Sequence, residues 1–361
     1  MNRNILLIAC CLLSNFSLAQ DTIRSYYDLE ESLLKEEYIR INGKANGDVK
    51  LYDEDGNLIL IGFLKDNLRH GVFADLDPTT GDTMRITPFV ENIRSGESKS
   101  FFPGGILKQI SMYSDNQITG VVITYYKSGQ IQDQTIFSNN KPNGLSESFY
   151  ESGKLASKVH FSDGRYEGAF IEYAENDQIL VSATYKDGEL DGRETQYFED
   201  GQVQSKIDYS KGVLSGIYEL NYPNGQPERR GNYKKGYEEG ELVSYHMNGT
   251  ISDKAIFKKG IHIQPTEKYF ESGKLKQKTN FDKSGNRTLE INYFENGQIY
   301  FAVNFLNNLA EGEVRLYRED GSLEEIRRFQ KGKLHGKREF FDEKEKLVNS
   351  ETYEKGNNIN K

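Results

Sequence analysis

Residues Tyr185–Gly201 read YKDGELDGRETQYFEDG, and residues Tyr209–Gly225, which begin 24 positions later, read YSKGVLSGIYELNYPNG. Both stretches place glycines three, seven and sixteen residues after an opening aromatic residue. That aromatic residue recurs on a 24-residue grid without exception, at Phe89, Tyr113, Phe137, Phe161, Tyr185, Tyr209, Tyr233, Phe257, Phe281, Phe305, Phe329 and Tyr353. A fixed internal period of this kind indicates a repeat protein, in which neighbouring repeats stabilise one another.

Three further positions of the repeat, which we call columns, recur with the same 24-residue period. A turn glycine recurs at Gly81, Gly105, Gly129, Gly153, Gly201, Gly225, Gly249, Gly273, Gly297 and Gly321, with Asp177 and Glu345 as departures. A second aromatic residue stands four positions before each turn point, at Phe101, Tyr125, Phe149, Tyr173, Tyr197, Tyr245, Tyr269, Tyr293, Tyr317 and Phe341, with Asn221 as the departure. An aliphatic residue stands two positions after it, at Leu107, Ile131, Leu155, Ile179, Val203, Ile251, Leu275, Ile299, Leu323 and Leu347, with Pro227 as the departure.

Within each repeat the side chains alternate with a period of two. In residues 203–209, the polar residues Gln204, Lys206 and Asp208 alternate with apolar or small ones, which is typical of a strand with one buried and one solvated face. A short Glu-Asp-Gly or Glu-Asn-Gly turn joins this run to the preceding aromatic segment, so each repeat is predicted to be a β-hairpin. The sequence therefore predicts an all-β fold, an elongated and twisted antiparallel sheet of tandem β-hairpin repeats with a 24-residue period.

A second connection joins consecutive hairpins. It has the form G-x-x-x-G in residues 188–192, 212–216, 236–240 and 332–336. Asparagine often replaces the first glycine, at Asn92, Asn116, Asn140 and Asn308. Glycine and asparagine tolerate a left-handed backbone best, so this column is predicted to have positive φ.

The repeats are predicted to form a single domain over residues 49–361, preceded by a degenerate repeat or cap in residues 20–48. The grid is out of step by one residue in the repeat that contains Gly56, and one glycine is displaced to Gly285.

Residues 1–19 differ from the rest of the chain. Arg3, an apolar run behind it and small residues before Gln20 predict a secretory signal that is cleaved after position 19, and hence an exported protein. The apolar run is too short to span a bilayer. A lipobox-like LIAC at residues 7–10 leaves open a lipid anchor at Cys10, which would be the protein's only link to a membrane.

The composition limits the possible partners. The formal net charge is −9, which argues against nucleic acid as a partner. The mean hydropathy of −0.71 is low, but 12% aromatic residues argue against disorder. We expect the two aromatic columns to form ladders on one face of the sheet, each ring packed against those of the adjacent repeats. The aromatic residues that directly follow the second column should point to the opposite side and could form an exposed binding stripe, at Tyr126, Tyr150, Phe198, Phe270 and Phe294.

No catalytic, cofactor-binding or metal-binding residues are predicted. The histidines occur at different repeat positions and are expected to be surface residues, at His70, His160, His246, His262 and His335. Residues 53–56 begin like a calcium loop but lack its later ligands, so they are interpreted as a turn. Acidic residues recur at equivalent turn positions, as at Asp200 and Asp320, whereas an active site needs one unusual position.

The order of aromatic, G-x-x-x-G, second aromatic, turn glycine and aliphatic residue resembles the MORN-repeat variant, often labelled as YwqK-type antitoxin components. The resemblance covers nearly all of the mature chain and implies a structural and interaction module. The antitoxin label implies a protein that binds and neutralises a toxin. YD/Rhs-type repeats share half of the motif, as in residues 52–58, but the regular G-x-x-x-G connection and the fixed step favour the MORN variant.

Three functions remain open. The first is an exported, non-enzymatic scaffold in the cell envelope whose partner is another protein of unknown identity. The second is an antagonist of a toxin. The third is an enzyme acting on surface polysaccharide, with a special site at Asp177, at Asn221 and Pro227, or at Gly285.

Overall fold

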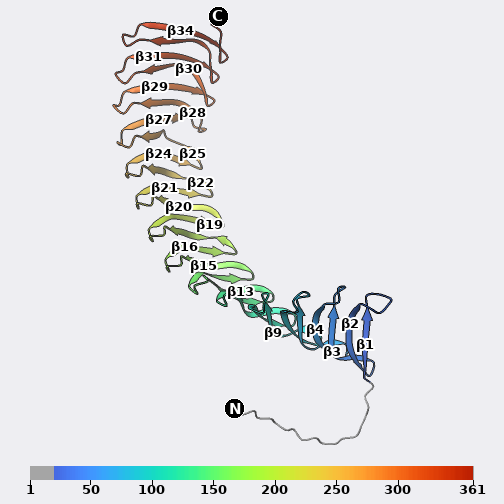
Figure 1. Cartoon of the computed structure of the whole chain (residues 1–361). Coiled ribbons are helices and arrows are strands. Elements are labelled where there is room, and N and C mark those ends of the chain that lie inside the picture. Colours follow the sequence, from blue (N-terminus) through green and yellow to red (C-terminus); the bar gives the residue numbers. More distant parts are fainter. Residues whose placement is uncertain (1–19, 361) are drawn as a thin grey trace. The chain divides into compact units, whose positions relative to one another are not determined.

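The computed structural model describes residues 20–360, and its regular elements are all β-strands (Figure 1). The predicted signal peptide, its cleavage site and the alternative anchor at Cys10 lie wholly or partly outside the described residues. The described part has no helix with the length and hydrophobicity of a membrane-spanning segment. Two compact units divide the chain, an N-terminal unit (Met1–Lys154) and a C-terminal unit (Leu155–Lys361).

Within residues 20–154, the N-terminal unit contains thirteen strands: β1 (Gln20–Tyr26), β2 (Leu34–Ile41), β3 (Lys44–Tyr52), β4 (Leu58–Lys65), β5 (Leu68–Arg69), β6 (Gly71–Leu76), β7 (Thr83–Val90), β8 (Ile93–Arg94), β9 (Gly96–Phe101), β10 (Leu107–Ser114), β11 (Gln117–Tyr125), β12 (Ile131–Ser138) and β13 (Lys141–Phe149).

The C-terminal unit contains the others: β14 (Leu155–Ser162), β15 (Arg165–Tyr173), β16 (Ile179–Lys186), β17 (Glu189–Leu190), β18 (Gly192–Tyr197), β19 (Val203–Ser210), β20 (Val213–Asn221), β21 (Pro227–Lys234), β22 (Tyr237–Glu238), β23 (Gly240–Tyr245), β24 (Ile251–Lys258), β25 (Ile261–His262), β26 (Thr266–Tyr269), β27 (Leu275–Phe281), β28 (Arg287–Tyr293), β29 (Ile299–Leu306), β30 (Leu309–Tyr317), β31 (Leu323–Gln330), β32 (Lys333–Leu334), β33 (Gly336–Phe341), β34 (Leu347–Glu354) and β35 (Asn357–Asn358).

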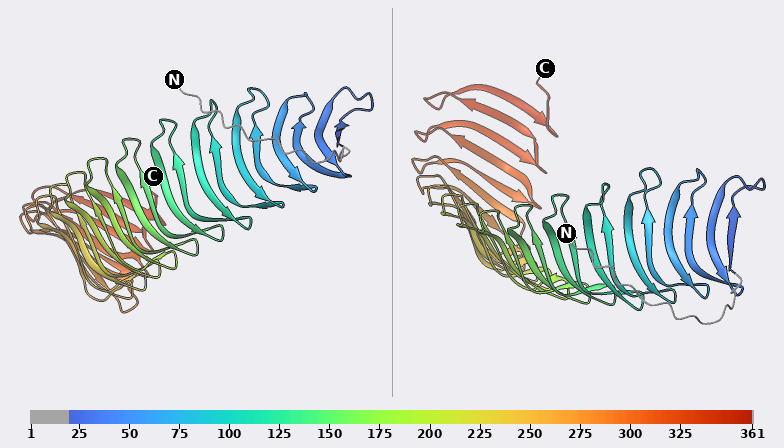
Figure 2. Two further views of the ribbon diagram at one scale, coloured as in Figure 1. Left: turned by 90° about the horizontal axis from the view of Figure 1, so that it is seen from below. Right: turned by 60° about the horizontal axis from the view of Figure 1, so that its bottom comes forward.

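Within each unit, strands that follow one another in sequence pair antiparallel. A two-residue strand such as β17 is the first part of the strand that follows it, because β16 pairs with both β17 and β18. Figure 2 shows the strands of each unit side by side and curved along their length. The prediction of tandem antiparallel hairpins is therefore confirmed.

The predicted period is also present in the structure. Strands β12, β14, β16 and β19 begin 24 residues apart. The shift near Gly56 arises from turn length: the turn after β6 is closed by the Asp77 N–H on the Asp82 carbonyl, whereas the turn after β3 is closed by the Asp53 N–H on the Asn57 carbonyl, one residue shorter.

The turn inside each repeat needs a left-handed residue at its glycine. The Gly201 N–H donates to the Phe198 carbonyl at 2.9 Å, and Gly201 has φ of 83°. This geometry is that of a type I turn followed by a left-handed residue. At the two departures from glycine, Asp177 and Glu345 adopt φ of 68° and 56°. The backbone therefore keeps its shape where the sequence supplies no glycine.

The connection between repeats is a two-residue type I′ turn. Asp187 and Gly188 have φ of 52° and 86°, and Lys186 pairs with Glu189 on either side of them. Type I′ turns require positive φ at both central residues. The prediction of positive φ at the glycine and asparagine column is confirmed. The residue before it is left-handed too, which the sequence did not predict.

The second glycine of G-x-x-x-G has a different role from the one expected. Gly192 does not lie in the chain reversal but in a bulge after it, with φ of 136°. A Cβ at Gly192 would lie 3.1 Å from the Cβ of Thr184 on the neighbouring strand. Glycine is therefore required here by backbone conformation and close approach together.

Hydrogen bonds link each type I′ turn to the preceding one. The Gly212 N–H donates to the Leu190 carbonyl at 2.8 Å, and the Asn116 N–H donates to the Arg94 carbonyl at 3.1 Å. An asparagine adds a second bond, because Asn116 Oδ1 accepts the Arg94 N–H at 2.9 Å. The same side-chain bond occurs at Asn67, Asn92, Asn140 and Asn308.

We predict that Asn116→Gly lowers the free energy of unfolding by about 1 kcal/mol, because it removes one hydrogen bond between turns. Gly212→Asn should raise it by a similar amount, since a Cβ at Gly212 would meet no atom within 4 Å and the left-handed backbone suits asparagine. Urea denaturation of both variants measures the effect. An unchanged midpoint for both would show that the side-chain bond contributes nothing.

The grid aromatics lie on one face of each sheet, together with the residues two and four positions before them. We call this the aromatic face. Tyr166 lies between Phe161 and Tyr185, with ring centroids 4.9 and 5.2 Å away, and His262 lies between Phe257 and Phe281 at 4.3 Å from each. The expectation that aromatics of adjacent repeats pack directly on one another was wrong for these pairs. A side chain from the intervening strand separates them.

Candidate interaction surfaces

The predicted exposed aromatic stripe is not present. Tyr126, Tyr150, Phe198, Phe270 and Phe294 are all partly buried. The Tyr126 hydroxyl donates to the Phe149 carbonyl at 2.8 Å. At the equivalent position of other repeats, the Tyr222 hydroxyl and the His246 ring bond the carbonyls of Tyr245 and Tyr269. These side chains lie across the turn of the next repeat, so they link repeats and do not form a free surface.

The histidines are less exposed than expected. His160 is exposed, and the other four are partly buried. Burial between two aromatic rings lowers the pKa of His262, which favours its neutral form near pH 7. Among residues 20–360, no group of three His, Cys, Asp or Glu side chains is arranged as metal ligands would be.

The departures from the repeat do not assemble into one site. Asn221 and Pro227 face each other across β20 and β21, and the Asn221 side-chain amide donates to the Val203 carbonyl at 2.9 Å. Asp177 and Gly285 lie in two other turns. The turn acids do what the sequence indicated, since Asp200 and Asp320 accept backbone N–H groups within their own turns.

Residues 53–57 form a turn, as predicted. Asp53 Oδ1 accepts the N–H groups of Asp55 and Asn57 at 3.0 and 2.8 Å. Hydrogen bonds from the Asn57 side chain and from these N–H groups hold the pKa of Asp53 below its usual value. The carboxylate is thus committed to closing the turn.

An apolar surface covers the N-terminal unit on the face opposite the aromatic face. We call it the apolar face; its exposed members are Ile61, Phe63, Val72, Met112, Val121, Ile136 and Leu145. Val72 is 57% exposed and Val121 is 46% exposed. Val121 is paired with Ile136 on the neighbouring strand. An ion pair between Lys99 and Glu97 on β9, 2.9 Å apart, separates the surface into two patches.

The same face of the C-terminal unit is more polar and carries ion pairs in several repeats. Its cross-strand neighbours form ion pairs, such as Arg193 with Asp208 at 2.7 Å. Glu313 and Arg328, 3.0 Å apart, occupy the repeat positions that Val121 and Ile136 occupy in the N-terminal unit. One backbone therefore presents a more polar surface in one unit and an apolar surface in the other.

A groove lies on the aromatic face of the N-terminal unit, with a volume of about 940 Å³. Its floor is a row of polar residues from successive strands, Asp75, Arg85, Ser100, Gln109, Thr124 and Asp133, in which each is the direct cross-strand partner of the next. Phe101 and Tyr125 line it at one end of the strands, and Tyr113 lines it at the other. Sequence analysis did not identify this groove.

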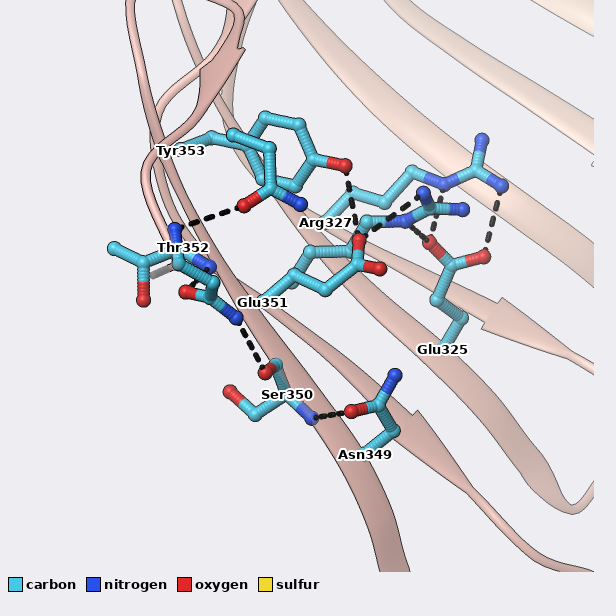
Figure 3. A network of polar contacts seen from close by, with 10 residues as sticks. Glu325, Arg327, Asn349, Ser350, Glu351, Thr352 and Tyr353 are labelled. Atoms are coloured by element: carbon cyan, nitrogen blue, oxygen red, sulfur yellow. Dashed lines mark hydrogen bonds and ion pairs between the residues drawn. The ribbon is translucent and has the colours of Figure 1, made fainter.

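The aromatic face of the C-terminal unit has a different character. Val303, Val314 and Leu316 form a buried apolar cluster under Phe301 and Phe305, beside a pocket of about 230 Å³. In the next repeat, buried Glu325 accepts hydrogen bonds from Arg327 and Arg338. Figure 3 shows Glu325 and Arg327 beside the side chains of β34. These residues pack the sheet.

The hairpin repeats of the structure correspond to a known family of repeats. Six segments match the family described as MORN repeat variant: residues 118–139, 142–163, 166–187, 190–211, 214–235 and 265–283. The first five begin 24 residues apart, and each begins just after a type I′ turn. The chain therefore contains MORN repeats. Its MORN repeats suggest a repeat-based interaction module.

No curated protein matches the chain. Among solved structures, it is similar to "Crystal Structure of TcdB2-TccC3-Cdc42", with 11% identity, a TM-score of 0.17, and coverage of 94% of this chain and 23% of that one. A Photorhabdus luminescens Tc holotoxin pore has 9% identity and a TM-score of 0.16 over 94% of this chain and 18% of that one. The chain therefore spans less than a quarter of the length of these structures.

Proposed function

We propose that the chain is an exported, non-enzymatic scaffold that binds another protein through the apolar face of the N-terminal unit. The observation that carries the proposal is the exposure of large apolar side chains at positions where the C-terminal unit has ion pairs. Contiguous apolar surface is costly to leave in water and commonly marks a protein interface. The signal-like residues 1–19 support export.

A double substitution tests this surface. Val121→Glu with Ile136→Arg copies Glu313 and Arg328 from the same positions of another repeat, so we expect the hairpin to fold normally while the apolar patch is lost. Capture of the native envelope partner by the full chain should fall at least about tenfold, because a desolvated charge replaces a buried apolar contact.

Ile217→Glu is the matched control. Ile217 occupies the Val121 position in the C-terminal unit and is 36% exposed, but it lies outside the apolar face. This variant should capture the partner as the wild-type chain does. Equal capture by the double variant would contradict the proposal.

The YwqK-type resemblance adds a second candidate, in which the captured protein is a toxin and binding neutralises it. A toxin assay with the wild-type chain and the double variant decides between the two roles. Protection that disappears in the double variant favours the antagonist, and absence of any protection favours the scaffold.

A further inference from the structure

We propose that the groove on the aromatic face of the N-terminal unit binds a neutral oligosaccharide. The site lies on the face opposite the proposed protein-binding surface, so it is a separate function of the same strands.

The floor of the groove offers unused hydrogen-bonding groups. Among the described residues, the side chains of Ser100, Gln109 and Ser111 have no hydrogen-bond partner, although all three line the groove. Ser111 is only 7% exposed. The Ser111 hydroxyl is not among the buried polar atoms that lack a partner, so these side-chain groups remain accessible, and the hydroxyl groups of a bound ligand can hydrogen-bond to them.

The polar groups are spaced regularly. Ser100 pairs with Gln109, and Gln109 pairs with Thr124, so the groups succeed one another at the strand spacing of about 4.8 Å. Serine hydroxyls and the glutamine amide can each donate and accept. A chain of similar units that each carry hydroxyl groups would find a matching group at each strand.

The charges at the groove balance. Asp75 pairs with Arg85 at 3.3 Å, and Asp133 accepts the Thr124 hydroxyl at 2.9 Å. The remaining charged residue in the lining is Lys108. Two acidic and two basic side chains provide no excess charge for a polyanion, which favours an uncharged ligand over nucleic acid or an acidic peptide.

The aromatic walls suit the apolar faces of sugar rings. Phe101, Tyr113 and Tyr125 border the row and are partly buried, so their orientations are restrained by packing. The Arg94 guanidinium covers one face of the Tyr113 ring at 4.7 Å from its centroid, so that face is already occupied. The face of an aromatic ring is electron-rich and attracts the C–H groups of a pyranose ring. An extended peptide is the less suitable occupant, because peptides usually add to a sheet at its edge, through backbone hydrogen bonds.

The same row changes character along the C-terminal unit. It is polar at Gln196 and Ser205, but it carries Leu220 and Arg229 in one repeat, and Phe301 and Leu316 in another. Gln277 provides a control, since it occupies the Gln109 position in a later repeat but lies outside the groove.

The test uses the full chain and a panel of neutral oligosaccharides derived from β-glucan, chitin and xylan, with binding measured by calorimetry and saturation-transfer NMR. At least one series should bind. Gln109→Leu should weaken that binding at least about tenfold, because it removes hydrogen bonds to the ligand. Gln277→Leu should leave it unchanged.

The Val121→Glu and Ile136→Arg variant should also bind the oligosaccharide normally, which separates this site from the proposed protein interface. The proposal is overturned if no oligosaccharide binds, or if Gln109→Leu binds as well as Gln277→Leu. It is also overturned if unstructured peptides, and not oligosaccharides, bind in a manner that depends on Gln109.

Discussion

Leu316→Ala is expected to lower the free energy of unfolding of the C-terminal unit by about 3 kcal/mol. Leu316 is 4% exposed, packs with Val303 and Val314, and faces Phe301 across the strands. Truncation removes the buried methyl groups and enlarges a pocket that already exists beside them. The thin sheet has few neighbouring atoms that could move in to fill the space.

Urea denaturation combined with hydrogen exchange of β29–β31 measures this loss, since repeat proteins can unfold in parts. Leu306→Ala is the control, because Leu306 is the last residue of β29 and is 61% exposed. That substitution should change stability by less than about 0.5 kcal/mol. Equal effects of the two substitutions would show that the cluster around Val314 does not act as a core.

Glu325→Ala is expected to destabilise the same unit by about 2–3 kcal/mol, because it leaves Arg327 without a carboxylate and leaves Arg338 with only the longer ion pair to Glu351 at 3.6 Å. Glu325 is 6% exposed and accepts Arg327 Nε at 2.7 Å and Arg338 Nε at 2.5 Å (Figure 3). We place the value at the lower end of the range for buried pairs, since a third of the Arg327 side chain is exposed to water.

The matched control copies an apolar repeat into this one. Glu325→Phe, Arg327→Val and Arg338→Val together reproduce Phe301, Val303 and Val314 at the same repeat positions. Replacing a buried ion cluster by packed apolar residues is often neutral or stabilising. We expect the triple variant to be about as stable as the wild type and Glu325→Ala to be less stable. This result would assign the loss of stability to the arginines that Glu325 no longer neutralises.

The stabilisation that Glu325 gives to the wild-type fold should be lost at acidic pH. Burial alone would raise the pKa of Glu325, but hydrogen bonds from Arg327 and Arg338 outweigh it and lower the pKa. A carboxyl group with a lowered pKa stabilises the fold above its unfolded pKa of about 4.3, and loses that effect as the pH falls through its folded pKa. The difference in stability between wild type and Glu325→Ala should therefore shrink below about pH 4.

Much of the fold could be predicted from sequence because a repeat gives many observations of the same position. The glycine and asparagine column indicated positive φ without any structure. The first residue of the type I′ turn could not be predicted in the same way, since lysine occupies it at Lys211, Lys235, Lys259 and Lys331. Lysine does not favour a left-handed backbone, so pairing of the flanking strands imposes it there.

The interaction surfaces were missed for two reasons. In residues 203–209 the polar and apolar side chains alternate, and the solvated face of that strand is polar. In another repeat the same face carries the apolar residues Val121 and Ile136. Comparing the columns repeat by repeat would have revealed this change. The groove could not be recognised because serine, threonine and glutamine are ordinary strand residues, and only the folded sheet brings Ser100, Gln109 and Thr124 into one row.

The antiparallel ladder has a kinetic consequence. Strand pairing joins residues that are close in the chain. Even Gln20 and Ile41, which pair between β1 and β2, are separated by these two strands and one loop only. All-β domains usually fold slowly because distant segments must find each other before any contact forms. Here every hairpin can form locally and template the next, so we expect folding to start at several places and spread outward in both directions.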